Sequence, residues 1–375
     1  MQVMRLLVLG GTRFLGRATA RAAVTLGDEV VCAARGISGA VPAGATFVAI
    51  DRDESEAYSA LAEFGDFDAV IDVSNRPSQV RSALAALGRR THHWIYISSI
   101  SAYADNETPG QAASTAPLLP PAALDVDEAD LANFGPCKVA CEQAVLDAMG
   151  AERTFICRAG LIVGPEDPSG RFTYWPNRIA RGGEILAPGN RDDAVQWIDV
   201  RDLAKWLIDV AHRKIAGIFD GLCEPIGRAD FLDGVARGVG ARGVGARGVG
   251  ARGVGALGVG ALGVGNETPE FTWVTQQFLE EQQVNPWYGP RSLPLWTPVP
   301  EYGGLLSRDG GPAKDSGLAC RDLAETARST LAWQRDTSSA IDASTSVGSA
   351  PVTPLRAGLT AEEEAEVLAA WHSAG

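Results

Sequence analysis

The stretch that most constrains the fold of this chain is LLVLGGTRFLG, residues 6–16. Its four leading apolar residues are enough for one buried strand, and a segment of helical composition follows the glycines directly. The first turn of a helix carries unpaired N–H groups and the positive end of the helix dipole, and glycines let the backbone approach an anion closely. The stretch therefore predicts a phosphate-binding turn made by Gly10, Gly11, Thr12, Arg13, Phe14, Leu15 and Gly16.

Apolar segments of strand length alternate with segments of helical composition through residues 1–165. The expected strands are residues 6–9, 29–34, 46–50, 67–73, 94–97 and 154–158. The expected helices are residues 17–26, 54–64, 77–87 and 131–149. This alternation predicts an α/β fold, a doubly wound parallel sheet of the Rossmann type. Ligands of such sheets bind beyond the carboxyl ends of the strands, which here are marked by Gly10, Arg35, Asp51, Val73 and Ser99.

The remaining sequence predicts a smaller C-terminal domain that is partly interleaved with the first. We expect a dinucleotide-binding Rossmann domain over residues 1–165 and a substrate-side domain over 166–334, with 195–211 returning to the Rossmann core. Residues 236–265 are six tandem pentapeptides, four Ala-Arg-Gly-Val-Gly and two Ala-Leu-Gly-Val-Gly. Their glycine content predicts a flexible surface loop, and their arginines offer a modest anion-binding patch as an alternative role.

The last forty residues predict a linker followed by one helix. Residues 335–355 are rich in Ser, Thr and Ala, which is typical of a linker. A helix is expected within 356–375, because Thr360 and Glu363 have the spacing of a capping box. We expect this helix to dock through Leu368 and Trp371.

Charge and composition exclude several classes of function. Formal net charge is −13, which disfavours binding to nucleic acid or to an acidic membrane surface. No run approaches the roughly 20 apolar residues that span a bilayer, and no secretory signal is visible. Four histidines and six dispersed cysteines offer no metal-ligand spacing. We expect a cytoplasmic protein without a metal and with reduced cysteines, Cys137 and Cys141 being small core residues.

The end of the second expected strand bears on cofactor choice. In dinucleotide-binding folds, an acidic residue about 20 residues past the glycine turn accepts a hydrogen bond from the ribose 2′-hydroxyl of NAD. Arg35 stands at this place. A cation suits a 2′-phosphate, so the sequence favours NADP, with NAD as the alternative. Alternatively, Arg35 is a solvated arginine at a strand end that takes no part in cofactor binding. Asp51, at the end of the third strand, is expected in the same cofactor site.

Four motifs together resemble the extended branch of the short-chain dehydrogenase/reductase superfamily, the NAD(P)-dependent epimerase/dehydratases. They are the turn at 10–16, the segment 98–103, the spacing from Phe134 to Lys138, and the segment 197–202. The resemblance covers about residues 1–230 and 266–334. It implies an NAD(P)-dependent oxidoreductase or epimerase that acts on a small carbonyl, sugar or nucleotide-sugar substrate. It also implies a homodimer.

The resemblance further implies a hydroxyl relay for proton transfer. By position, Ser99 corresponds to the serine that holds the substrate oxygen and Lys138 to the lysine that holds the nicotinamide ribose. The place of the proton-donating tyrosine holds Phe134, which has no proton to transfer. General acid–base catalysis contributes roughly 10²–10⁴-fold to rate. Tyr103 and Tyr174 are the candidate substitutes, unless both simply line the pocket.

The glycine turn also departs from the branch, because Arg13 stands where a middle glycine is usual. Its guanidinium can bond a phosphate oxygen in compensation. Similar Gly-Gly-Thr-Arg-Phe turns occur in a subgroup that includes chloroplast stem-loop RNA-binding proteins. RNA binding therefore stays open, against the acidic charge, as does a noncatalytic NADP-binding sensor or scaffold. Arg171 and Arg178 are candidate contacts for an anionic substrate, and Arg158 is either a core or a substrate-side arginine.

Overall fold

The computed structural model describes residues 2–241, 268–343 and 357–374. Most of the pentapeptide repeat and most of the expected linker lie outside these residues. The chain divides into two compact units, which are described separately. Unit 1 comprises Met1–Ile162, Gln196–Pro225 and Glu301–Cys320, and unit 2 comprises Val163–Val195, Ile226–Pro300 and Arg321–Gly375.

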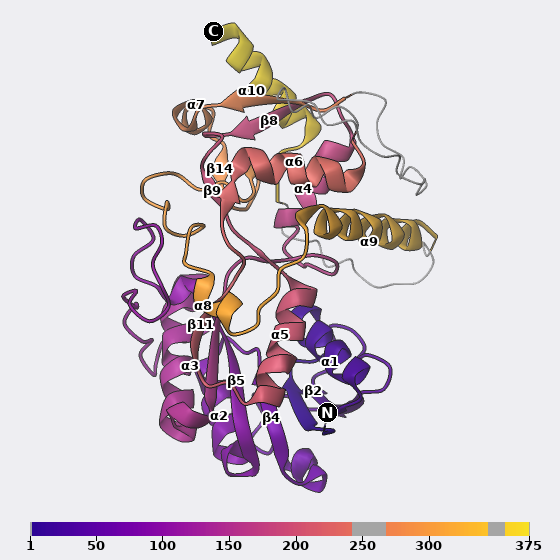
Figure 1. Cartoon of the computed structure of the whole chain (residues 1–375), viewed down its shortest axis with the longest axis vertical. Coiled ribbons are helices and arrows are strands. Elements are labelled where there is room, and N and C mark those ends of the chain that lie inside the picture. Colours follow the sequence, from indigo (N-terminus) through magenta and orange to yellow (C-terminus); the bar gives the residue numbers. More distant parts are fainter. Residues whose placement is uncertain (1, 242–267, 344–356, 375) are drawn as a thin grey trace. The chain divides into compact units, whose positions relative to one another are not determined.

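Unit 1 is built on a sheet of seven parallel strands (Figure 1). The strands are β1 (Arg5–Leu9), β2 (Glu29–Ala34), β3 (Thr46–Ala49), β4 (Phe67–Asp72), β5 (Thr91–Ser99), β6 (Thr154–Ala159) and β11 (Gly217–Gly221). Their order in the sheet is β11-β6-β5-β4-β1-β2-β3. The crossover between β3 and β4 reverses the direction of winding at β1. The predicted doubly wound parallel sheet is confirmed.

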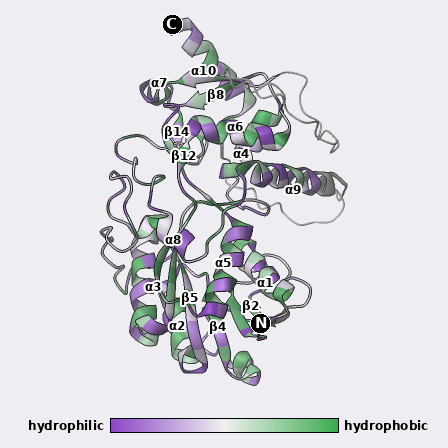
Figure 2. Ribbon diagram, viewed as in Figure 1, coloured by the Kyte–Doolittle hydropathy of each residue, from purple (hydrophilic) through white to green (hydrophobic). Residues whose placement is uncertain are grey.

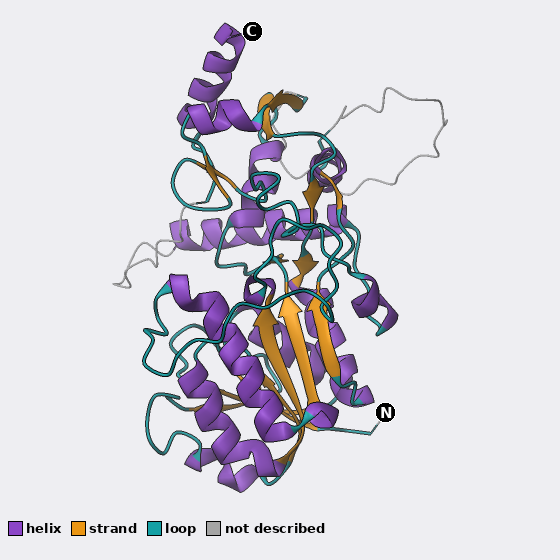
Figure 3. Cartoon of the chain, turned by 90° about the vertical axis from the view of Figure 1, so that its left-hand side faces the viewer, coloured by secondary structure: helices purple, strands orange, loops and turns teal. Residues whose placement is uncertain are grey.

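Helices cover both faces of this sheet (Figure 3). Helices α1 (Phe14–Leu26) and α5 (Val200–Arg213) pack on one face, and α2 (Pro77–Leu87) and α3 (Phe134–Met149) on the other. Along β1, Leu6 and Val8 join the core beneath α1 and α5, whereas Leu7 and Leu9 join the core beneath α2 and α3. A parallel sheet buried on both faces needs such uninterrupted apolar strands. In Figure 2, hydrophobic residues run along the strands of this sheet, with paler and hydrophilic residues between them.

The remaining elements of unit 1 are short. They are β10 (Ile198–Asp199), α8 (Gly311–Asp315) and the 3₁₀ turns η1 (Ser59–Phe64), η2 (Gly88–Arg90), η3 (Ile100–Ala102), η4 (Leu131–Asn133) and η5 (Ala151–Arg153). The prediction of a helix at 54–64 is thus wrong for the first half of this segment. The second half forms the 3₁₀ turn η1. Strand β5 begins three residues earlier than expected, and this extension buries His93.

Unit 2 holds three pairs of short strands, two parallel and one antiparallel, and several helices. The strands are β8 (Glu184–Pro188), β13 (Glu270–Val274), β9 (Ala194–Val195), β12 (Ile226–Gly227), β14 (Asn285–Pro286) and β15 (Ser292–Leu293), while β7 (Ile162–Val163) spans the boundary in sequence. The helices are α4 (Arg171–Ala180), α6 (Arg228–Val239), α7 (Gln276–Glu281), α9 (Leu323–Ala343) and α10 (Ala361–Ala374). Helix α4 and strand β8 lie within residues 166–190, a segment for which no helix or strand was expected. Helix α9 continues to Ala343, into the expected linker.

Helix α10 docks as the sequence predicted. The Thr360 N–H donates to the Glu363 Oε2 at 2.8 Å, and the Glu363 N–H donates to the Thr360 Oγ1 at 3.1 Å, which confirms the capping box. Leu368 is buried, and the Trp371 ring packs edge-on against Phe278 with centroids 5.0 Å apart.

The sequence led us to expect that all cysteines are reduced, and this expectation is wrong for two of them. Cys223 and Cys320 form a disulfide within unit 1. The two residues are 97 apart in sequence, so their spacing gave no indication of their proximity. The other four cysteines are free and buried: Cys32, Cys137, Cys141 and Cys157. Among the described helices, none combines the length and apolarity that crossing a membrane requires.

Candidate functional site

The turn after β1 brings the start of α1 against the backbone of β1. Gly10 has φ +101°, a left-handed conformation that favours glycine, and its N–H donates to the Ala33 carbonyl at 3.0 Å. A Cβ at Gly16 would lie 2.2 Å from the Gly10 carbonyl oxygen. Only glycine permits this approach, which holds the N-terminus of α1 directly beneath the turn. The glycine turn at the start of a helix, here called the cradle, is as the sequence predicted, and its binding of an anion stays a prediction.

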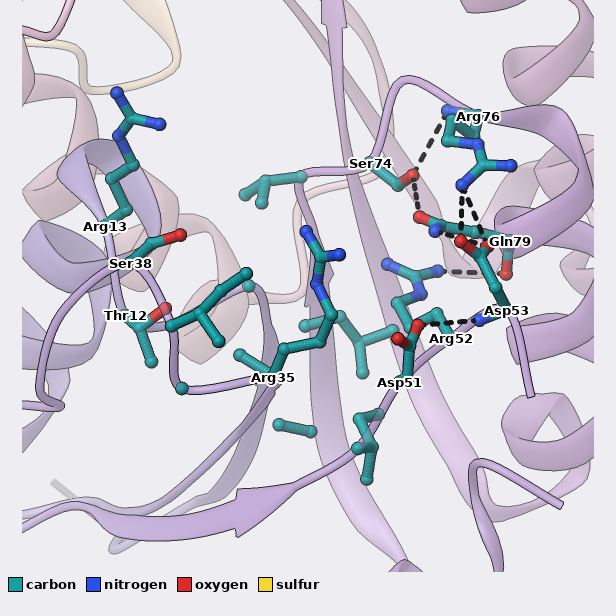
Figure 4. Close-up of a pocket in the computed structure, with 18 of the residues that line it drawn as sticks. Thr12, Arg13, Arg35, Ser38, Asp51, Arg52, Asp53, Ser74, Arg76 and Gln79 are labelled. Carbon is teal, nitrogen blue, oxygen red and sulfur yellow. Dashed lines mark hydrogen bonds and ion pairs between the residues drawn. The ribbon is translucent and has the colours of Figure 1, made fainter. Parts of the chain in front are cut away.

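Arg13 caps α1 in an extended conformation, with φ −140° and ψ 143°. Any residue adopts this conformation, so the turn tolerates a side chain where the related motif has a glycine. The next residue, Phe14, has φ +39°. The Arg13 side chain is exposed and stands at the mouth of the cradle (Figure 4).

A pocket of about 320 Å³ opens at the carboxyl ends of β1 to β4. Its walls come from the turn after β1, the ends of β2 and β3, and the β4–α2 connection with the start of α2. The lining residues are 9, 10, 12, 13, 33–38, 50–53, 73–76 and 79. Figure 4 shows Arg35 projecting between Thr12 on one side and Asp51 on the other. Thus Gly10, Thr12, Arg13, Arg35 and Asp51, all predicted as cofactor contacts, line one pocket.

Three charged residues of this pocket, Arg52, Asp53 and Arg76, are paired with opposite charges. Arg52 forms a bidentate pair with buried Asp72, at 2.7 and 2.9 Å. Asp53 pairs with Arg76 at 2.7 Å. It also accepts a bond from the Gln79 side chain at 2.9 Å, and these bonds lower the pKa of the Asp53 carboxyl.

Among the residues that the structure describes, Arg13 and Arg35 take part in no hydrogen bond or ion pair through their guanidinium groups. Arg35 does contribute to lowering the pKa of Asp53 through its charge. Both guanidinium groups are exposed at the pocket and available to a ligand. The pocket therefore fits an anionic ligand with two separate charged groups, one at the cradle and one at the end of β2.

Ser99, Phe134 and Lys138 come together at the carboxyl end of β5. The Ser99 Oγ accepts a bond from the Ser101 N–H at 3.1 Å and so caps η3. A Cβ at Gly135 would lie 2.2 Å from the Ser101 carbonyl oxygen, so the first turn of α3 packs directly on η3. Helix α3 carries Phe134 and Lys138 one turn apart, on the same side.

Lys138 is buried and makes two bonds to the backbone. Its Nζ donates to the Ile97 carbonyl at 2.6 Å and to the Ser74 carbonyl at 3.0 Å. The same Nζ lies 5.0 Å from the centre of the Tyr96 ring and 5.8 Å from that of Phe134. Burial lowers the pKa of Lys138 to about 8. Lys138 therefore ties the end of β5 to the β4–α2 connection, which lines the pocket.

Tyr103 is engaged in a separate buried network. Its hydroxyl donates to the Asp220 Oδ1 at 2.6 Å and accepts from the Arg158 Nη1 at 3.1 Å. The ring is 2% exposed. Burial raises the pKa of the phenol above its usual value, and the nearby Asp220 acts in the same direction. Both hydrogen-bonding roles of this hydroxyl are thus used away from Phe134.

The network includes three residues that sequence reasoning missed: Glu142, Asp220 and Arg308. Arg158 pairs with Glu142 through two bonds of 2.9 and 2.7 Å, so it is a core arginine. Arg308 donates from Nε to the Asp220 Oδ2 at 2.7 Å. Arg308 and Asp220 are 88 residues apart, and neither belongs to a motif, so the sequence carried no signal for this contact.

Unit 2 contains the arginines that were candidates for an anionic substrate. Arg178 is buried, pairs with Glu364 on α10 and donates to the Gly182 and Glu184 carbonyls, so its role is structural. Arg171 donates from Nε to the Ser169 Oγ at 3.2 Å and lies 4.9 Å from the centre of the Trp287 ring. Tyr174, the second candidate proton donor, is buried in this unit.

The sequence pattern of the NAD dependent epimerase/dehydratase family matches residues 6–218. The chain belongs to this family. These proteins are extended short-chain dehydrogenases, as the motifs at the glycine turn and around Ser99 indicated. No curated protein matches the sequence.

Solved structures of several epimerases are similar in fold to this epimerase/dehydratase-family chain. The UDP-glucose 4-epimerase of Thermotoga maritima, solved with UDP-glucose, has a TM-score of 0.58 at 15% identity over 89% of this chain and 99% of that one. The UDP-glucose 4-epimerase of Thermus thermophilus, solved with NAD, has a TM-score of 0.57 at 19% identity, over 88% and 99%. At these identities the likeness shows a shared fold alone.

Proposed function

We propose that this family member binds NADP in the pocket at the ends of β1 to β4. We further propose that it is an oxidoreductase or epimerase that acts on a sugar or nucleotide-sugar substrate. The observation that carries the cofactor proposal is Arg35, which stands in the pocket at the end of β2 without a carboxylate partner among the described residues. A 2′-phosphate supplies the negative charge that this guanidinium lacks.

The residues of the pocket fit the charged parts of such a cofactor. The cradle formed by Gly10, Gly16 and the start of α1 suits a diphosphate, because backbone N–H groups and the helix dipole favour negative charge. Arg13 adds a cation at the same place. Lys138 lies at the end of β5, where it would hold the nicotinamide ribose in exchange for one of its two backbone bonds.

The nicotinamide, when bound, supplies hydride acceptance or donation. The chain's own residues orient the substrate and transfer a proton to or from it. Ser99 presents its hydroxyl at the carboxyl end of β5, in a position suited to hold a substrate oxygen. Phe134 at the expected tyrosine position cannot donate a proton, and the Tyr103 hydroxyl is already bonded to Asp220 and Arg158. We therefore propose that proton transfer is the weak step of this site.

A titration of the purified chain with NADPH and with NADH, followed by nicotinamide fluorescence, tests the cofactor proposal. We expect NADPH to bind more tightly than NADH. The Arg35→Asp variant should reverse this order, because it replaces a cation by a carboxylate at the 2′ position. Arg35→Lys, which keeps the charge, is the matched control and should retain the preference for NADPH. Equal weakening of both cofactors by Arg35→Asp would remove Arg35 from this role.

A second candidate function is noncatalytic binding of NADP, in a sensor or scaffold. The observation that favours it is the absence of a phenol at Phe134 combined with the engagement of Tyr103 elsewhere. RNA binding, which the glycine-turn subgroup suggested, has only the turn in its favour, and the net charge of −13 opposes it.

A further inference from the structure

Residues 301–320, here called the strap, belong to unit 1, although the chain on either side of them belongs to unit 2. The strap lies along the loop that follows Ser99 and Tyr103. Three backbone hydrogen bonds of 2.7 to 3.1 Å hold the two segments together: Gly304 N–H to Asn106, Gly110 N–H to Ser307, and Asp309 N–H to Gln111. The strap therefore covers a segment that is continuous with the proposed substrate-binding serine.

Arg308 is the buried anchor of the strap. It is 3% exposed, and its guanidinium lies 3.4 Å from the centre of the Tyr103 ring. The side chain pairs with Asp220, which also accepts from the Tyr103 hydroxyl. A buried ion pair is stable only while both partners remain in place. Any opening of the strap must therefore withdraw Arg308 from Asp220.

A disulfide fixes the strap close to this anchor. Cys320, the last residue of the strap, is bonded to Cys223, which follows β11 and lies three residues after Asp220. The Gln196 side chain joins the two features, because its Nε2 donates to the Cys223 carbonyl at 2.7 Å and to the Arg308 carbonyl at 2.8 Å. The Gln196 Oε1 also accepts from the Arg308 N–H at 2.9 Å.

The two cysteines differ in their access to solvent. Cys320 is exposed, whereas Cys223 is 9% exposed. The four remaining cysteines are buried. Among the six cysteines, Cys320 is therefore the one most accessible to a dissolved thiol.

We propose that the Cys223–Cys320 disulfide is a thiol-exchange site for dithiol reductants, and that its redox state controls how firmly the strap is held over Tyr103 and Asp220. A thiolate of the reductant attacks the Cys320 Sγ. The S–S bond breaks, and its electron pair leaves on Cys223 as a thiolate. The second thiolate of the reductant then attacks the reductant's sulfur in the mixed disulfide and releases Cys320 as a thiolate. The reductant ends as a cyclic disulfide, and two electrons have passed to the protein.

The consequence follows from the position of the bond. With the disulfide intact, one end of the strap is covalently tied to the chain segment that carries Asp220. With the bond reduced, the covalent tie at residue 320 is gone, and the strap is held by noncovalent contacts such as those of Arg308, its backbone hydrogen bonds and the burial of Leu318. Openings that withdraw Arg308 then become more frequent, because the disulfide no longer restricts the motion of residue 320. This inference concerns the strap and does not depend on which cofactor is bound.

Hydrogen exchange of the full chain, with and without dithiothreitol, tests the proposal. Native alkylation followed by mass spectrometry should label no cysteine in the oxidised chain and two, Cys223 and Cys320, after reduction. We expect reduction to speed exchange in peptides covering 301–320 and 104–111 by on the order of tenfold or more. Peptides covering β1 and β4 should exchange at unchanged rates and serve as the internal control for folding.

The Cys320→Ser variant separates loss of the bond from other effects of the reductant. It should exchange rapidly in the strap without dithiothreitol and show no further change when the reductant is added. Equal exchange of the strap in the oxidised and reduced wild-type chain would overturn the proposal. So would native alkylation of Cys223 and Cys320 in the untreated, air-oxidised chain. The wild-type comparison alone decides the matter if the variant does not fold.

Discussion

Phe134 stands where the family resemblance leads us to expect the proton-donating tyrosine, and we propose that the chemistry of this chain departs there from the expected relay. Its ring packs near the Nζ of Lys138, so the site keeps an aromatic side chain and a buried amine one helical turn apart. If the proposed relay is right, the site lacks only the hydroxyl. A single substitution would then supply the proton donor with little change in the volume of the ring.

The Phe134→Tyr variant should raise the turnover of NADPH with a carbonyl or nucleotide-sugar substrate. We expect a gain of roughly 10²–10⁴-fold, the usual contribution of a positioned acid–base group. Steady-state absorbance at the nicotinamide band measures it. The control is the double variant Phe134→Tyr with Tyr103→Phe. Its turnover should depend on pH in the same way as that of Phe134→Tyr, because the Tyr103 hydroxyl is bonded to Asp220. Unchanged turnover in Phe134→Tyr, with cofactor bound, would favour the noncatalytic alternative.

At the residue scale, sequence reasoning identified the groups with motifs and missed those without them. Gly16 and Arg35 were named because their places after the first two strands follow from the repeat of strand and helix, and Lys138 was named through the family resemblance. Their roles in a cofactor site stay predictions. Asp220 and Arg308 were not found, since a long-range ion pair leaves no local pattern. Tyr103 was one of two candidate proton donors, and the sequence could not indicate that its hydroxyl is bonded to Asp220.

Strand β5 carries a buried titratable group at the end opposite the site. Burial lowers the pKa of His93 to about 4, and the nearby positive charge of Lys214 acts in the same direction. The ordinary value for histidine is 6.5. Between pH 6.5 and 4 the unfolded chain therefore binds a proton that the folded chain does not, so stability falls as the pH falls through this window.

The His93→Phe variant should remove this dependence. Wild-type protein is expected to lose up to about 3 kcal/mol of unfolding free energy to His93 between pH 6.5 and pH 4. The unfolding free energy of His93→Phe should fall by that much less over the same pH range, as measured by urea unfolding at both pH values. His92→Gln, a change at an exposed position of the same strand, is the matched control. Parallel pH profiles for the wild type and His93→Phe would contradict this account.

Helix α10 depends on one buried ion pair. Glu364 bonds Arg178 on α4 and also accepts from the Leu186 N–H at 3.1 Å. Removing one partner of a buried pair leaves an uncompensated charge. The Glu364→Ala variant should thus lower the unfolding free energy by about 3–5 kcal/mol, whereas Glu362→Ala, at an exposed position of the same helix, should change it little. Calorimetry measures both, and equal effects would show that the pair does not hold α10.

Elements with a clear period were predictable, and those interrupted by turn-forming residues were not. The apolar runs of β1, β2, β4 and β6 specified their strands. Helix α4 was missed because Gly170 precedes it and Pro176 lies inside it, and both residues commonly mark loops. Its buried face, which includes Phe172, Trp175 and Ile179, is nevertheless spaced as a helix requires.

At the scale of the whole molecule, the chain contributes to unit 1 three times and to unit 2 three times. The return of residues 195–211 to the first domain was predictable from their resemblance to family motifs. The return of residues 301–320 was not, because nothing in their composition distinguishes a strap on unit 1 from a loop of unit 2. The same holds for the disulfide, which joins segments that are adjacent only after folding.

The central claim is that NADP lies against the cradle at the start of α1, with its 2′-phosphate at Arg35. Hydrogen exchange of the full chain with and without saturating NADPH tests this most directly. The account predicts slower exchange in peptides covering residues 10–17 and 35–38 when NADPH is present, with a smaller effect from NADH at 35–38. Unchanged exchange in both peptides at saturating NADPH, or protection confined to peptides of unit 2, would contradict it.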